Sequence, residues 1–344
     1  MGPRDQDRGH QGRLKRSGIS LDTWTTEIFG PLNMTTARTT AILLMSSLMS
    51  VPAAAQTAPP LDYAVVADSF SLPSGMTFGS TSGVAINSKG HIFVLHRGPN
   101  PLMEFDANGK FLRALGDGLF DRPHGLRIDA QDNIWTTDAR SHVVYKFSPE
   151  GRILLVLGVR DTAGEMHSYG HLRLFNEPND MAFGPQGEIF VVQGHGRGEP
   201  KVIKFDKDGN FIKAWGKKGT GAGEFDIAHS IAIDAQGLLY VADRNNQRIQ
   251  VFDGDGKYLR ESKHPGTPCG LFIDSDQNLW LAHGHAGRLI KLDLNGNVLG
   301  VTGSQGKAPG QFGEAHFLAV SAQGDVYIAD TLNWRVQKFV RKSP

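Results

Sequence analysis

Short stretches of alternating apolar and polar residues recur along the chain from about residue 62 to its end. Each unit opens with a short apolar strand and passes through a turn that contains Gly or Asn. A second alternating strand follows, such as LYVA at 239–242, and then a third, such as RIQVF at 248–252. Alternation with a period of two predicts β-strands. The pattern therefore predicts an all-β protein built from repeats.

Six copies of this unit can be aligned, and they are spaced about 40 to 55 residues apart. The residues that open the six copies are Ser82, His124, Asn179, His229, Cys269 and His316. Four short antiparallel strands per unit are typical of the blades of a β-propeller. We therefore expect a six-bladed β-propeller over residues 62–344.

The two ends of the repeat region indicate how the ring closes. The sixth copy stops after its third strand, at 335–340, and lacks a counterpart of the fourth strands at 111–115 and 211–215. The segment 63–70 (YAVVADSF), before the first copy, has the apolar pattern of the missing strand. An N-terminal strand that completes the last blade would remove the free sheet edges that invite aggregation.

Histidine opens every second copy, at His124, His229 and His316. Blades of a six-fold ring are about 60° apart, so alternate blades place three side chains about 120° apart around the central channel. Three neutral imidazoles with an open fourth position are the ligand set of a catalytic zinc. The sequence therefore predicts a zinc site at the centre of the ring.

A second column lies 14 residues after each opening residue, where all three histidines have an aspartate: Asp138, Asp243 and Asp330. Two interpretations are open. Each carboxylate could fix the tautomer of the nearby imidazole, or it could cap the turn after the second strand. One residue further on stand Arg97 in the first copy and Arg244 in the fourth, which face each other across a six-bladed ring. Because arginine binds carboxylates bidentately, these two predict a small-molecule or peptide substrate that carries a carboxylate.

The composition and the N-terminal sequence limit the class of binding partner and the cellular location. The net charge is +1 with scattered basic residues, which indicates neither a nucleic-acid footprint nor a polybasic membrane patch. The apolar run at 39–51 is followed by PAAAQ, which resembles a signal-peptidase site. We expect cleavage after Ala55, no membrane span, and a secreted or periplasmic protein. Residues 1–55 are then the N-terminal extension and signal peptide, and 56–61 a linker. Cys269 is the one cysteine, so no intramolecular disulfide can form.

The repeats at 243–253 (DRNNQRIQVFD) and 330–339 (DTLNWRVQKF) resemble NHL repeats. The segments around the candidate site match more than a repeat class. They resemble the peptidyl-α-hydroxyglycine α-amidating lyase (peptidylamidoglycolate lyase) family through LHRG at 95–98, RPHGL at 122–126, HSIA at 229–232, ADRNNQRIQ at 242–250 and AH at 315–316. The resemblance implies a six-bladed propeller that cleaves a C-terminal α-hydroxyglycine to an amide and glyoxylate. It also implies zinc ligands at His124, His229 and His316, and substrate-binding arginines at Arg97 and Arg244.

The chain departs from this family at three positions. His195 stands where the family motif has the tyrosine implicated as general base, and histidine can itself serve as a base. Phe317 replaces the aspartate that binds the family's structural calcium, so we do not predict calcium. Glu314 replaces a methionine and would bring a carboxylate near the metal.

Two other functions remain open. A metal-dependent hydrolase of lactones or esters could use the same three histidines, with zinc hydroxide as the nucleophile. An NHL propeller without enzymatic activity could instead serve as a binding platform, and it would bind no metal in the channel.

Overall fold

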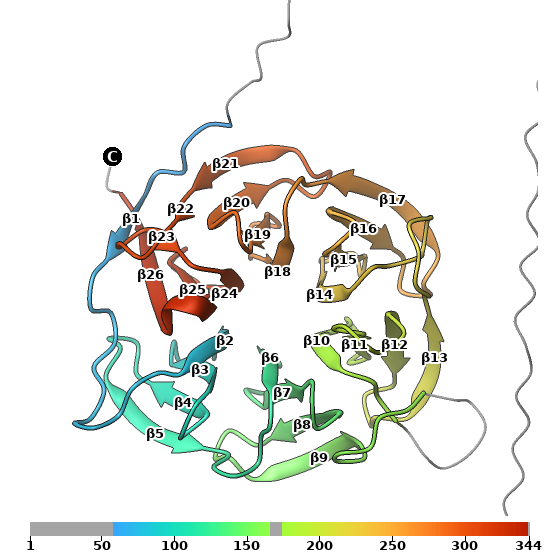
Figure 1. Ribbon diagram of the computed structural model, residues 1–344, viewed down its shortest axis with the longest axis horizontal. Coiled ribbons are helices and arrows are strands. Elements are labelled where there is room, and N and C mark those ends of the chain that lie inside the picture. The colour runs from blue at the N-terminus through green and yellow to red at the C-terminus, as the bar shows by residue number, and fades with distance from the viewer. Residues whose placement is uncertain (1–57, 166–173, 343–344) are drawn as a thin grey trace, which may run out of the picture. The chain divides into compact units, whose positions relative to one another are not determined.

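The computed structural model describes residues 58–165 and 174–342, which form six four-stranded antiparallel sheets arranged as a ring (Figure 1). This confirms the predicted all-β, six-bladed propeller. The innermost strands of blades one to six are β2 (Ser80–Ile86), β6 (Pro123–Ile128), β10 (Pro178–Phe183), β14 (Ala228–Ile233), β18 (Pro268–Ile273) and β24 (Ala315–Val320). The second strands are β3 (Ile92–Arg97), β7 (Ile134–Asp138), β11 (Ile189–Gln193), β15 (Leu239–Asp243), β19 (Leu279–His283) and β25 (Val326–Asp330).

The third strands are β4 (Leu102–Phe105), β8 (Val143–Phe147), β12 (Lys201–Phe205), β16 (Arg248–Phe252), β20 (Arg288–Leu292) and β26 (Arg335–Arg341). The outer strands are β5 (Phe111–Leu115), β9 (Ile153–Gly158), β13 (Phe211–Trp215), β17 (Tyr258–Lys263), β21 (Val298–Thr302) and, in blade six, β1 (Tyr63–Val66). A short parallel pair, β22 (Ser304–Gln305) with β23 (Gln311–Phe312), and the 3₁₀ turn η1 (Thr331–Asn333) lie in the connections around blade six.

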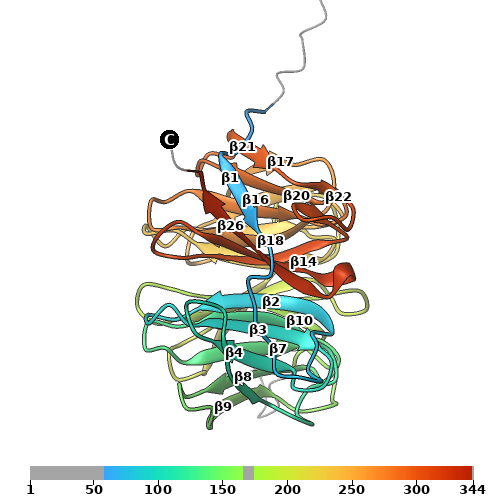
Figure 2. The ribbon, with the colours of Figure 1, turned by 90° about the vertical axis from the view of Figure 1, so that its left-hand side faces the viewer.

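The N-terminal strand closes the ring, as the sequence predicted. β1 pairs antiparallel with β26, so that Tyr63 lies opposite Arg341 and Val66 opposite Lys338 (Figure 2). Just before β1, the backbone at 59–61 hydrogen-bonds to Val301 of β21 in blade five. The segment 59–66 therefore contacts blades five and six, just before the seam, which is the junction between blade six and blade one. The expected signal peptide and its cleavage site lie outside the described residues.

Six apolar clusters hold the ring together, one between each pair of neighbouring blades. The cluster between blades two and three joins Trp135 and Val144 to Met181 and Val191. The cluster that spans the seam packs Val84 and Val94 of blade one against Tyr327 and other residues of blade six. Because the inner strands of each blade are buried on both faces by such contacts, the core is continuous around the ring. No helix in the described residues is long and apolar enough to cross a membrane.

Candidate metal centre

The residues that open the six repeats all lie in β-bulges of the innermost strands. In every blade the pairing of the first and second strands shifts register at this position. A bulge leaves a residue out of the ladder and redirects its side chain, and bulges are common beside active sites. The six bulged residues are buried: Ser82, His124, Asn179, His229, Cys269 and His316.

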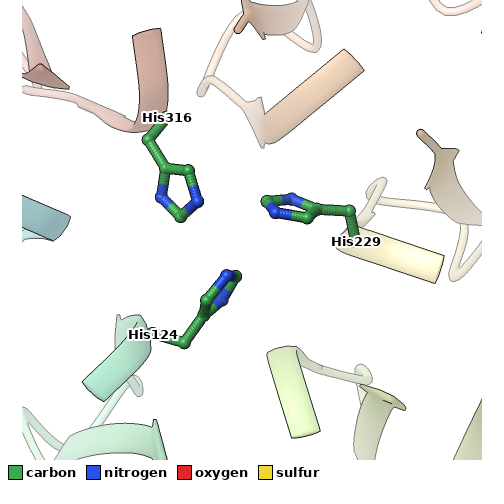
Figure 3. Close-up of side chains that lie close together, drawn as sticks. All are labelled: His124, His229 and His316. Atoms are coloured by element: carbon green, nitrogen blue, oxygen red, sulfur yellow. The ribbon is translucent and has the colours of Figure 1, made fainter. Parts of the chain in front are cut away.

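The three histidines of this set converge at the centre of the ring (Figure 3). One ring nitrogen from each of His124, His229 and His316 lies within 4.8 Å of the other two. Their ring centroids are 4.8 to 5.0 Å apart. The spacing predicted from alternate blades is therefore observed, and it leaves room for one metal ion between three imidazoles.

Backbone carbonyls of the neighbouring blades fix the tautomer of these histidines. The Nδ1 atoms of His124, His229 and His316 lie 2.8, 2.9 and 2.7 Å from the carbonyl oxygens of Asn179, Cys269 and Ser82. A carbonyl can only accept a hydrogen bond, so each Nδ1 carries the proton and donates it. Each Nε2 then keeps a lone pair, which is the atom that binds a metal.

The Nε2 atoms of His124 and His229 are buried and have no hydrogen-bond partner among the described residues. An unpaired buried acceptor is costly, and a bound cation would satisfy it. Burial lowers the pKa of all three imidazoles well below the usual value, and the nearby charge of Arg97 lowers the pKa of His124 and His316 further. The three ligands are therefore neutral near pH 7, the form that coordinates a metal. The residues present fit a metal ion bound by three imidazoles.

The aspartates of the second column do not touch the histidines. Asp138 pairs with Pro123, the residue before His124, and not with His124 itself. Its carboxylate accepts hydrogen bonds from the backbone N–H groups of Asp121, Arg122, Arg140 and Ser141. The turn-capping interpretation therefore holds for Asp138, whereas Asp243 and Asp330 also form ion pairs with Arg248 and Arg335.

The two predicted arginines lie at the ends of second strands, beside the histidines. Arg97 ends β3; its Nε donates to the carbonyl of Pro123 at 3.3 Å, and its Nη2 is buried without a partner among the described residues. Burial, and then the charge of Arg122, lower the pKa of Arg97 to about 10. Arg244 follows β15, and its Nη2 lies 3.3 Å from Oε1 of Glu314. Arg97 thus keeps an unused donor, whereas Arg244 is held by a carboxylate.

His195 lies against His124 and His229, in the loop that follows β11. Its ring centroid is 4.8 Å from that of His124 and 5.5 Å from that of His229. Burial lowers the pKa of His195 to about 3, with further lowering by the charges of Arg122 and Arg244. The structure therefore brings together the three predicted ligands and His195.

Phe317 contacts all three histidines at the centre of the ring. Its ring centroid is 4.7 Å from His316 and 5.5 Å from His124, and it stacks on His229 at 5.7 Å. The guanidinium of Arg127 is 5.7 Å from the centre of the Phe317 ring. An aromatic ring and a cation therefore fill the channel where the amidating-lyase motif has an aspartate.

Sequence reasoning missed an ion pair that joins neighbouring blades near Phe317. Arg127 of blade two binds both carboxylate oxygens of Asp180 of blade three, at 2.9 and 2.5 Å. Asp180 also accepts from the Ser230 hydroxyl and the Ile231 N–H of blade four, and Arg127 donates to the Leu271 carbonyl of blade five. Arg122, the first residue of the RPHGL segment, was given no role there either.

Comparison with known proteins agrees with this architecture. A family model described as a 6-bladed beta-propeller matches residues 186–317. The human NHL repeat-containing protein 3 is 31% identical over 288 residues, which cover 76% of this chain and 80% of that protein. The chain belongs to this family of NHL-repeat propellers, which includes amidating lyases.

A probable peptidyl-alpha-hydroxyglycine alpha-amidating lyase of Caenorhabditis elegans is 28% identical over 297 residues, covering 73% of this chain and 79% of that protein. The mouse peptidyl-glycine alpha-amidating monooxygenase is 30% identical over 302 residues, but this NHL-repeat chain spans only 30% of its length. Among solved structures, a streptogramin B lyase superposes with a TM-score of 0.60 at 13% identity, over 81% of this chain and 98% of that one. At that identity the likeness shows the fold alone.

Proposed function

We propose that the protein is an exported zinc-dependent carbon–nitrogen lyase that cleaves an α-hydroxyglycine-type carbinolamide to an amide and glyoxylate. The observation that carries the proposal is the convergence of three neutral imidazoles, fixed in one tautomer, beside the unused buried donor of Arg97. Relatives that are named amidating lyases, at 28% identity, support it.

Each group of the site has a role in this reaction. His124, His229 and His316 would hold the metal through Nε2, and a bound zinc ion would supply a Lewis acid that lowers the pKa of the substrate hydroxyl. The free Nη2 of Arg97 would bind the substrate carboxylate, which suits a buried guanidinium that lacks an anion. Arg244, already paired with Glu314, would orient the neighbouring carbonyl.

His195 would accept the hydroxyl proton. Its low pKa keeps it neutral near pH 7, and a substrate carboxylate would offset the arginine charges that lower this pKa. As the proton leaves, the C–O bond becomes a carbonyl and the C–N bond breaks. The electron pair of that bond departs with the amide nitrogen, which takes up a proton. The products are the amide and glyoxylate.

Two measurements on the purified protein test this proposal. Metal analysis should give about one zinc per chain, and incubation with α-hydroxyhippurate should release glyoxylate and benzamide. His229→Ala should lose both, whereas His91→Ala, at a histidine that pairs with Glu104 away from the channel, should keep both. Bound zinc without glyoxylate release would overturn the lyase, and the absence of bound metal would favour a binding platform.

A metal-dependent hydrolase of esters or lactones is the second candidate. The contact of His195 with His124 favours it, because this chain has an imidazole where the lyase motif has a tyrosine. A neutral imidazole can deprotonate an attacking water as well as a substrate hydroxyl. Zinc-dependent release of acid from an ester panel, with no glyoxylate from α-hydroxyhippurate, would select this function.

Export rests on the apolar run and the PAAAQ segment near Ala55. Protein recovered from the periplasm or the medium should begin at Gln56 when its N-terminus is sequenced. Recovery of an intact N-terminus from the cytoplasm alone would contradict export.

A further inference from the structure

A cavity of about 590 Å³ lies between the loops of blades two and three. Its lining includes three arginines, one carboxylate, one histidine and one amide: Arg122, Arg140, Arg197, Glu177, His142 and Asn176. None of these residues is a metal ligand. The cavity is therefore a compartment distinct from the three histidines.

Two residues of the cavity lining, Arg122 and Glu177, lie close to the metal centre. Arg122 precedes Pro123 and His124 in the chain, and its charge acts on both His195 and Arg97. Glu177, which also lines the cavity, acts on His195 as well. A substrate held at the histidines would thus have one end beside this cavity.

A single pinned loop connects the two compartments. It leaves β11 after Gln193 and presents His195 to the histidines and Arg197 to the cavity. One oxygen of Glu177 accepts the backbone N–H groups of Gly196 and Arg197, at 2.7 and 2.8 Å. Because these bonds fix the loop before any ligand arrives, little ordering cost remains for binding.

The balance of charge in the cavity is positive. The Glu177 oxygen that faces the loop is already engaged, and Arg140 lies 3.8 Å from the partly exposed Asp121. The guanidinium groups of Arg122 and Arg197 have no hydrogen-bond acceptor or ion-pair partner within the described part of the chain. Guanidinium groups that lack an anion and line a concave surface concentrate positive potential there.

We propose that this cavity binds an anionic group on the acyl side of the substrate, so that the enzyme prefers an α-hydroxyglycine whose acyl part carries a second carboxylate. The inference rests on the proposed function and names the substrate class for it. The glycine carboxylate would go to Arg97, and the second carboxylate to Arg122 and Arg197, which can form the paired hydrogen bonds that arginine makes with carboxylates.

Two substrates of matched length test the preference: N-succinyl-α-hydroxyglycine, whose acyl group is acidic, and N-butyryl-α-hydroxyglycine, whose acyl group is neutral. We expect kcat/KM to favour the acidic substrate by about 10-fold or more, from the hydrogen bonds to a charged group. Arg197→Gln should reduce this ratio about 10-fold. Lys207→Gln removes the same charge from an exposed site on blade three and should leave the ratio unchanged.

A binding measurement separates failure of this inference from failure of the lyase. N-Succinylglycine and N-butyrylglycine lack the hydroxyl group and cannot be cleaved, so calorimetry reports their affinities alone. Tighter binding of N-succinylglycine by about 10-fold, lost in Arg197→Gln, would support the cavity assignment even if neither hydroxylated substrate is cleaved. Equal affinities, or a preference that survives Arg197→Gln, would overturn it even if glyoxylate is released.

Discussion

Replacing Asp180 with alanine should destabilise the propeller strongly, because it leaves a guanidinium unpaired in the channel. The Asp180 side chain is fully buried and that of Arg127 is 13% exposed. The carboxylate accepts four hydrogen bonds: two from Arg127, one from Ser230 and one from Ile231. Removing one partner of a buried ion pair costs about 3–5 kcal/mol, mostly because the remaining charge stays desolvated.

Urea unfolding followed by circular dichroism measures this loss. Thermal unfolding gives a second measure of the same loss. The Tm of a domain of 150–250 residues falls by about 2–4 °C for each kcal/mol lost. At about 2 °C per kcal/mol, a loss of 3–5 kcal/mol lowers the Tm by about 6–10 °C. Asp208→Ala removes a carboxylate from the exposed Lys207–Asp208 pair and should cost under about 0.5 kcal/mol.

The double variant Arg127→Met/Asp180→Leu separates the contribution of the charges to stability from the contribution of side-chain packing. Apolar residues of similar volume commonly replace a buried ion pair at little cost, so the double variant should be more stable than Asp180→Ala. A cost below about 1 kcal/mol for Asp180→Ala would refute the reasoning. A double variant less stable than the single one would refute it as well.

Three further changes probe the frame around the site. Trp280→Phe removes the indole N–H that donates to Asp274 at 2.7 Å, and urea unfolding should show a loss of about 1–2 kcal/mol; no loss would mean that water replaces the indole. Gly109→Ala places a Cβ about 1.8 Å from the Ser69 carbonyl oxygen at φ +79°, so its Tm should fall, and an unchanged Tm would contradict this backbone geometry. Truncation of residues 58–66 exposes the edge of β26, and light scattering should show association of the chains; a stable monomer would show that the blade tolerates an open edge.

Much of the fold could be predicted because each blade repeats one pattern at the level of single residues. Alternation located the strands, and the truncated sixth copy located the seam. The convergence of the candidate metal ligands could be predicted because a propeller maps one repeat column onto one ring of positions. His124, His229 and His316 share that column, so their convergence follows from register alone.

The surroundings of the ligands could not be predicted in the same way. The acceptors for the three Nδ1 atoms are backbone carbonyls of the next blades, and no side chain marks a carbonyl in a sequence. Arg127 and Asp180 did leave a signal. Asp180 lies one residue, and Arg127 three residues, after the residue that opens its repeat, and the other repeats have Ala, Gly, Ser or Phe at these positions. A comparison of these two repeat positions would have indicated a buried ion pair. The link from Arg122 to the cavity depends on loop conformation, which repeat alignment does not contain.

The hydrogen bond from His316 to Ser82 crosses the seam, because His316 belongs to the last blade and Ser82 to the first. The orientation of the third metal ligand thus depends on the two ends of the repeat region being joined. Binding of the proposed metal ion and closure of the ring would then be thermodynamically linked: the bound ion would favour the closed ring by as much as closure favours the ion. The affinity for the proposed metal ion would therefore measure how firmly blades one and six are joined, and a variant that weakens this junction would lose the ion before its blades unfold.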